Sequence, residues 1–276
     1  MTNIFKTIIL LGILSVVFIV VGGFFGGTDG IIIAFVISLL LNGGMYFFSD
    51  KLALSMSRAK PLKKSQNPKL YAMVEDLSLR MKLPMPQLYI TPSPQANAFA
   101  TGRDPKHASV AVTDGILRIL SEDELRGVLA HELSHVKNRD ILVASIAAVM
   151  ASAISFIGNM ALFGGYSDDE DRGGGIFAIV AAILLPIAAS LIQLAISRQR
   201  EFGADDSGAK AIGSGKSLAK ALLAIHDSTR TRPMHTNPAF SSLYIENPSG
   251  GIGGKIAKLF STHPPVEERV KRLQKI

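Results

Sequence analysis

The chain has 276 residues, and its share of charged residues, 18%, is below the roughly one quarter typical of soluble domains. Its 29 Lys and Arg outnumber its 22 Asp and Glu, but no basic stripe interleaved with aromatic residues indicates a nucleic-acid partner. The absence of cysteine excludes a disulfide framework and a thiolate zinc site, so a metal has to be held by His and carboxylate groups.

Four long apolar runs predict transmembrane helices, at about residues 7–27, 30–48, 141–163 and 176–197. Each run is close to the ~20 residues that cross a bilayer, and each lacks Asp, Glu, Lys and Arg. The first run also has features of a signal peptide, but a second run follows it directly, so we expect a retained anchor. Four such runs in a chain of this length argue against the alternative, buried helices of a large soluble core.

The loops between the runs predict the orientation in the membrane. The loop between the third and fourth runs is acidic and rich in glycine. Basic residues instead follow the second run, precede the third and follow the fourth: Lys51, Arg58, Lys60, Lys63, Lys64, Lys137, Arg139, Arg198 and Arg200. The positive-inside rule therefore predicts a multi-pass protein with both termini and residues 49–140 in the cytoplasm.

The segment between the second and third runs has the pattern of a small α+β domain. Apolar residues at helical spacing predict a helix over residues 67–82, and Pro84 ends that pattern. Three short runs separated by turn residues, at 87–90, 96–100 and 109–112, suit strands. We therefore expect a small antiparallel sheet.

The chain thus divides into two membrane parts and two cytoplasmic parts. The C-terminal part is predicted to contain helices at 198–212, about 216–227 and about 265–275, with loops or a lid between the last two. The predicted parts are residues 1–50 (two transmembrane helices), 51–140 (catalytic part), 141–197 (two transmembrane helices) and 198–276 (catalytic part).

A metal-binding pattern lies in the next predicted helix. Ser121 and Glu124 have the spacing of a capping box, and the helix they begin contains His131-Glu132-Leu133-Ser134-His135. Residues four apart share a helix face, so both imidazoles can reach one ion, and Glu132 lies about 100° away around the helix. This arrangement suits a zinc hydrolase in which Glu132 takes a proton from water. The alternative is two solvent-facing histidines.

A catalytic zinc site needs a third protein ligand, and the sequence leaves several candidates. Glu201 and Asp205 are four residues apart, so Glu201 could bind the metal while Asp205 accepts the N–H of His131. The even number of predicted spans between the two motifs places them on the same membrane face. The other interpretation of Glu201 is a surface carboxylate. The remaining candidates are His226, His235, His263 and Asp140, and we interpret Asp140 as a helix cap or a member of a local ion pair.

These segments together resemble the HtpX-type endopeptidases, membrane members of the family that also contains the CAAX prenyl endopeptidases. The resemblance covers essentially the whole chain. It rests on the segments Asn97–Gly102, His131–Asp140, Arg200–Asp205 and His263–Pro265 and on Arg269. It implies a mainly α integral membrane protein with four transmembrane helices and a gluzincin-like α+β zinc-peptidase domain.

The resemblance also implies roles for individual residues. One Zn²⁺ per chain is expected on His131, His135 and Glu201, with Glu132 as general base. His263 is expected to stabilise the oxyanion.

The resemblance and the positions of the residues in the sequence also predict roles for Arg269 and for one strand. Arg269, on the helix after His263, is expected to position that histidine. The segment Asn97, Ala98 and Phe99 is expected to be an edge strand that pairs with the substrate backbone.

The family further implies a place in the cell. Quality control in the cytoplasmic (inner) membrane of a prokaryote is expected, with membrane-protein or unfolded polypeptides as substrates; the sequence leaves the oligomeric state open. An intramembrane protease is disfavoured because polar residues flank the metal motif. A zinc carrier is disfavoured because the predicted spans hold no ionisable residues, and a scaffold would not need Glu132.

Overall fold

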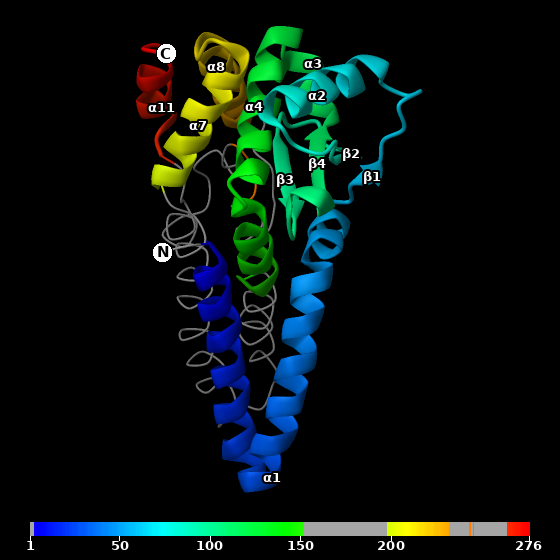
Figure 1. Cartoon of the computed structure of the whole chain (residues 1–276), viewed down its shortest axis with the longest axis vertical. Coiled ribbons are helices and arrows are strands. Elements are labelled where there is room, and N and C mark those ends of the chain that lie inside the picture. Colours follow the sequence, from blue (N-terminus) through cyan, green and yellow to red (C-terminus); the bar gives the residue numbers. More distant parts are fainter. Residues whose placement is uncertain (1–2, 152–197, 232–242, 244, 246–263) are drawn as a thin grey trace, which may run out of the picture.

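The computed structural model describes residues 3–151, 198–231, 243, 245 and 264–276. These residues form a long helical hairpin and, at one end of it, a domain of helices around a small sheet (Figure 1). The hairpin is helix α1 (Asn3–Met56), which folds back on itself at Gly27, where φ is 53°. Glycine adopts this left-handed conformation without a Cβ clash.

The two arms of α1 contain the first two predicted apolar runs and are held together by a polar contact. Asn42 Nδ2 donates to Ser15 Oγ at 2.8 Å and to the Leu11 carbonyl at 3.3 Å. Within the described residues, Gly26–Met56 is the helix long and apolar enough to cross a membrane. Its large apolar side chains are mostly exposed, as expected for contact with lipid.

The remaining predicted runs are only partly visible. A shorter apolar helix, Asp140–Ala151, corresponds to the beginning of the third run. The rest of the third run and the whole fourth run lie outside the described residues.

The sheet has four strands in the order β1–β2–β4–β3: β1 (Lys60–Pro61), β2 (Gln87–Thr91), β4 (Ala108–Thr113) and β3 (Ala98–Gly102). β3 and β4 form an antiparallel pair, but β2 runs parallel to β4. The prediction of an antiparallel sheet is therefore wrong for this pair. The chain passes from β2 to the far edge before it returns as β4, and residue alternation within strands does not reveal which strands become neighbours.

Helices cover the sheet and each other. They are α2 (Pro68–Met81), α3 (Asp114–Ile119), α4 (Glu122–Lys137), α7 (Arg198–Ile212), α8 (Lys216–Thr231) and α11 (Val266–Leu273). α4 lies between the sheet and the α7–α8 pair (Figure 1). Its predicted capping box is confirmed, because Ser121 Oγ accepts from Glu124 N at 3.4 Å while the Glu124 carboxylate accepts from Ser121 N at 2.9 Å.

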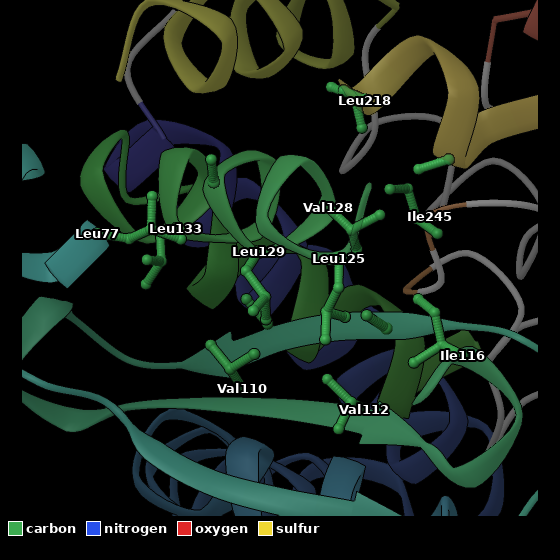
Figure 2. Packing of buried hydrophobic residues seen from close by; sticks show 14 of the residues in the cluster. Leu77, Val110, Val112, Ile116, Leu125, Val128, Leu129, Leu133, Leu218 and Ile245 are labelled. Atoms are coloured by element: carbon green, nitrogen blue, oxygen red, sulfur yellow. The ribbon is translucent and has the colours of Figure 1, made fainter. Parts of the chain in front are cut away.

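The main core fixes the position of α4. Leu125, Leu129 and Leu133 of α4 point toward Val110 and Val112 of β4 (Figure 2). Burial of each of these leucines contributes about 1.5–3 kcal/mol to folding. With this face of α4 packed on the sheet, the opposite face carries the histidines toward α7.

Candidate metal centre

Three potential metal ligands converge between α4 and α7. His131 and His135 lie on α4 and Glu201 on α7, and one ligand atom from each lies within 4.8 Å of the others. The two Nε2 atoms are 3.2 Å apart, and the Glu201 oxygens lie 3.6 Å from His131 Nε2 and 3.5 Å from His135 Nε2. His131 and Glu201 are buried, whereas His135 is partly exposed. The predicted ligands are therefore brought together.

Small residues allow α7 to approach α4 this closely. A Cβ on Gly208 would lie 3.0 Å from the His131 backbone nitrogen and 3.1 Å from the Ala130 carbonyl carbon. Ala204 and Ala209 on the same helix are fully buried. The contact between these two helices therefore sets the distance between the histidines and Glu201.

His131 is oriented by the carboxylate that the sequence analysis assigned to it. Asp205 Oδ1 lies 2.9 Å from His131 Nδ1. Burial lowers the pKa of His131, so the neutral ring donates Nδ1–H to Asp205 and directs the Nε2 lone pair toward the other ligands. This part of the predicted geometry is confirmed.

Arg269 of α11 binds Asp205, a partner that the sequence does not predict. It is fully buried, and its Nε and Nη2 donate to the two Asp205 oxygens at 2.9 and 2.7 Å. Burial acts to raise the pKa of Asp205, but the Arg269 guanidinium outweighs it and holds that pKa below its usual value. Arg269 thus keeps Asp205 ionised. The predicted contact of Arg269 with His263 stays a prediction, because His263 lies outside the described residues. His235 lies outside them as well.

His135 has its own carboxylate partner, Asp140, for which the sequence predicts a helix cap or a local ion pair. The ion pair exists, since Arg200 Nη1 lies 3.6 Å from Asp140 Oδ1. The same carboxylate also lies 3.2 Å from His135 Nδ1, a contact the sequence analysis missed. Burial lowers the pKa of His135, but Glu201 and Asp140 outweigh it and raise the value to about 9.

The donor set fits a tetrahedral divalent metal. Because the Nδ1 atoms of both histidines face carboxylates, their Nε2 atoms point at each other at 3.2 Å. Two lone pairs at this distance need a cation between them, either a proton or a metal. Two nitrogen ligands of tetrahedral zinc are roughly 3.4 Å apart when each bond is ~2.0–2.1 Å. The residues therefore match such an ion without rearrangement.

Glu132 lies beside the ligands and against the sheet edge. It is 3% exposed, and it accepts a hydrogen bond from the backbone N–H of Ala100 in β3. Burial raises the pKa of Glu132 to about 7, and the Glu201 charge acts in the same direction. A pKa raised toward neutrality suits a group that takes up and releases a proton.

The expected substrate strand is at the sheet edge, but it is partly covered. The Ile245 backbone N–H donates to the Ala98 carbonyl at 3.3 Å and to Asn97 Oδ1 at 3.1 Å. The Phe99 side chain is buried in a second apolar cluster with Leu54 and Leu243. A peptide that pairs with β3 at Ala98 must therefore replace the hydrogen bond from Ile245. The sequence does not predict this contact between Ile245 and the edge strand.

The chain is similar to several known proteins. Residues 64–276 match Peptidase family M48. The chain is 51% identical to a Protease HtpX homolog of Pelotomaculum thermopropionicum, with 98% of both chains covered. It is 50% identical to another from Thermococcus kodakarensis, covering 98% of this chain and 95% of that one. The crystal structure of S. mikatae Ste24p matches with a TM-score of 0.48 and 19% identity, over 88% of this chain and 57% of that chain.

Proposed function

The chain belongs to peptidase family M48 and is a metalloprotease, and from this premise we propose that it is a zinc-dependent endopeptidase at a membrane surface. One zinc ion is held by His131, His135 and Glu201, and Glu132 is the general base. The observation that carries the proposal is the convergence of the three ligand side chains, His131, His135 and Glu201, with both histidine Nδ1 atoms turned toward carboxylates. Two histidines, one carboxylate and no thiolate suit zinc among the divalent ions.

The reaction we propose divides the work between the metal and the protein. Zinc, when bound, supplies Lewis acidity toward the peptide carbonyl and lowers the pKa of water. Glu132 accepts the proton of the attacking water and delivers it to the nitrogen of the leaving amine. The Ala100 N–H keeps the Glu132 carboxylate oriented during both transfers. His263 remains the predicted donor to the oxyanion.

The substrate is proposed to bind as an added strand along β3, beside Asn97, Ala98 and Phe99. β3 is the last strand of the sheet, and α4, with Glu132, packs against it. A strand added here would bring a peptide bond to Glu132 through backbone contacts, which favours cleavage of unfolded segments with little sequence preference.

The cellular setting we propose is the inner membrane of a prokaryote, with the site on the cytoplasmic side. The exposed apolar surface of Gly26–Met56 supports a membrane anchor, and the basic residues after it support the orientation. Misfolded membrane proteins are the proposed substrates, because the catalytic domain lies directly at the end of this helix (Figure 1).

The test compares three forms of detergent-purified protein: the parent, Glu132→Gln and Glu122→Gln. Glu122 is a matched control, an exposed glutamate on the same helix that pairs with Lys69. Each form is stripped with a chelator and resupplied with zinc, and bound zinc and casein cleavage are measured. We expect about one zinc in every form and a cleavage rate about 10²–10⁴-fold lower in Glu132→Gln alone. Equal cleavage by Glu132→Gln would refute the general-base role, and loss of zinc from it would refute the ligand assignment.

A further inference from the structure

Asp140 sits at an unusual position relative to the histidine it contacts. Residues five apart on a straight α-helix are about 140° apart around the axis, so Asp140 would point away from His135. Instead, α4 ends at Lys137, and Arg139 has a φ of 58°. This left-handed conformation costs a non-glycine residue about 1–2 kcal/mol. It turns the chain so that Asp140, the first residue of the next helix, comes back under His135.

Two contacts hold Asp140 there. Its Oδ2 lies 3.2 Å from His135 Nδ1, and its Oδ1 lies 3.6 Å from Arg200 Nη1. Asp140 is 5% exposed, and Arg200 is mostly buried. Arg200 directly precedes Glu201 on α7, so the same helix supplies a metal ligand and the counter-charge for Asp140.

We propose that Asp140 is a positioning residue for His135, held by Arg200, and that it prepares the metal site by fixing the ring orientation and tautomer of that ligand. The inference rests on the proposed zinc site. With this role for Asp140, each histidine ligand has a carboxylate partner that is paired with an arginine. The two sets are His131–Asp205–Arg269 and His135–Asp140–Arg200. Losing a carboxylate that orients a metal-bound histidine costs about 10–100-fold in metal affinity.

The test measures zinc dissociation constants by competition with a chromophoric chelator. Asp140→Asn keeps the shape of the side chain but removes its charge, and Asp206→Asn is the control, a partly exposed carboxylate on α7 that pairs with Arg272. We expect about 10–100-fold weaker zinc binding in Asp140→Asn, a smaller loss in Arg200→Gln and no change in Asp206→Asn.

Two further measurements separate positioning from folding and from the proposed function. The melting temperature of the zinc-free forms shows whether Asp140→Asn folds, and the visible spectrum of bound Co²⁺ reports ligand geometry. Equal zinc affinity and an unchanged Co²⁺ spectrum in Asp140→Asn would overturn the positioning role, while a parent that binds no zinc would instead overturn the proposed function. If Asp140→Asn does not fold, Arg200→Gln with parental zinc affinity and spectrum would overturn the proposed arrangement.

A second, independent feature is a cavity where α1 meets the sheet. Its volume is about 490 Å³, and it lies between the last turns of α1 and the β3–β4 connection. Its lining includes three aromatic rings and three basic side chains: Phe47, Phe48, Tyr89, Lys51, Arg103 and Lys106.

The charges of the cavity favour an anion. Lys51 Nζ lies 5.4 Å from the centre of the Phe48 ring, and the Arg103 guanidinium lies 5.7 Å from that of Phe47. Within the part of the chain that the structure describes, neither Lys51 nor Lys106 is in an ion pair. Asp50 is the acidic residue of the lining, so positive charge is in excess.

The rim of the cavity is held in place by Asp104. This residue pairs with His107 at 2.9 Å and with Arg103 at 3.7 Å. Its side chain also accepts hydrogen bonds from the Lys106 and His107 backbone N–H groups. The β3–β4 connection is thus ordered around the cations.

The position of the cavity indicates which anion it takes. Phe47 and Phe48 are 54% and 50% exposed and belong to the last turns of the apolar helix, where the charge-free run ends at Ser49. Aromatic and basic residues at this point of a spanning helix lie at the level of lipid headgroups. We infer that the cavity binds the phosphate of an anionic phospholipid headgroup.

The test uses protein in neutral detergent with added short-chain phosphatidylglycerol, phosphatidylcholine or glycerol phosphate. A ligand that binds only the folded state raises the melting temperature. We expect phosphatidylglycerol to raise it more than the other two, and the triple variant Lys51→Gln, Arg103→Gln, Lys106→Gln to lose that rise. The matched control, Arg58→Gln, Lys60→Gln, Lys63→Gln, removes the same number of positive charges from exposed residues just beyond α1 and should keep the rise.

Three outcomes would overturn the lipid assignment. An equal rise with glycerol phosphate would mean that the site takes soluble phosphate. An equal loss in both triple variants would mean general charge attraction. A parent with no response to phosphatidylglycerol would mean that the cavity binds no such headgroup.

Discussion

Arg269 offers a sharp test of how the centre is held together. Arg269→Met keeps most of the side-chain volume but removes the charge and the hydrogen bonds that the guanidinium donates, among them two to Asp205 and one to the Ile245 carbonyl. Both Arg269 and Asp205 are at most 1% exposed, so the variant leaves a carboxylate buried with His131 as its remaining partner in the centre. Breaking a buried ion pair in this way costs about 3–5 kcal/mol.

This cost can be expressed as a melting temperature. The family region spans residues 64–276, and a domain of that size shifts by about 2–4 °C for each kcal/mol. We therefore expect Arg269→Met to melt about 6–20 °C below the parent, measured by circular dichroism in detergent. Arg272→Met, which removes a half-exposed arginine on the same helix, should cost at most about 1 kcal/mol.

A double variant identifies the origin of the loss. If the cost comes from the unpaired charge, adding Asp205→Asn to Arg269→Met should recover part of the stability, because the neutral amide still accepts from His131. The reasoning is refuted if Arg269→Met costs no more than Arg272→Met. It is also refuted if the double variant melts below the single one, because the lost packing of Arg269 would then dominate.

Three further predictions concern the metal and the helices that carry it. Chelator removal of the metal should lower the melting temperature reversibly, with recovery on zinc addition. Zinc affinity should rise about tenfold per pH unit from 7 to 9 in equilibrium competition, because the raised pKa of His135, about 9, means that binding displaces a proton; a flat profile would contradict this. Gly208→Ala should weaken zinc binding because its Cβ would press on the His131 backbone, whereas Gly203→Ala on the same helix has open space and should leave affinity unchanged.

The parts of the site that the sequence predicts are those set by local helix geometry. The capping box of α4, the shared face of His131 and His135 and the shared face of Glu201 and Asp205 all depend on spacings of three or four residues. The spacing to Asp205 and the even number of predicted spans made Glu201 a candidate ligand, and the resemblance selected it over the other candidates. The structure contains these features because the geometry of a single α-helix determines each of them.

The contacts that the sequence does not predict are those set by the packing of helices and strands against one another. Asp140 reaches His135 only because the chain turns at Arg139, and a positive φ at an arginine has no sequence signal. The Arg269 partner depends on α11 packing against α7, and the contact of Ile245 with β3 joins residues 148 apart in the chain. The parallel pairing of β2 and β4 is likewise a tertiary choice.

The charges in the centre explain why a divalent cation suits it. Among the residues that the structure describes, four carboxylates and two guanidinium groups are gathered there: Glu132, Asp140, Glu201 and Asp205 with Arg200 and Arg269. With both histidines neutral and every carboxylate ionised, the sum is −2, a charge that a buried site cannot carry without compensation. Burial together with the Glu201 charge raises the pKa of Glu132, and the Glu201 and Asp140 charges raise that of His135, so both groups can hold a proton in the metal-free protein. A divalent ion would bring this sum to zero and favour loss of those protons, so under the proposed function metal binding would leave Glu132 ionised, as a base has to be.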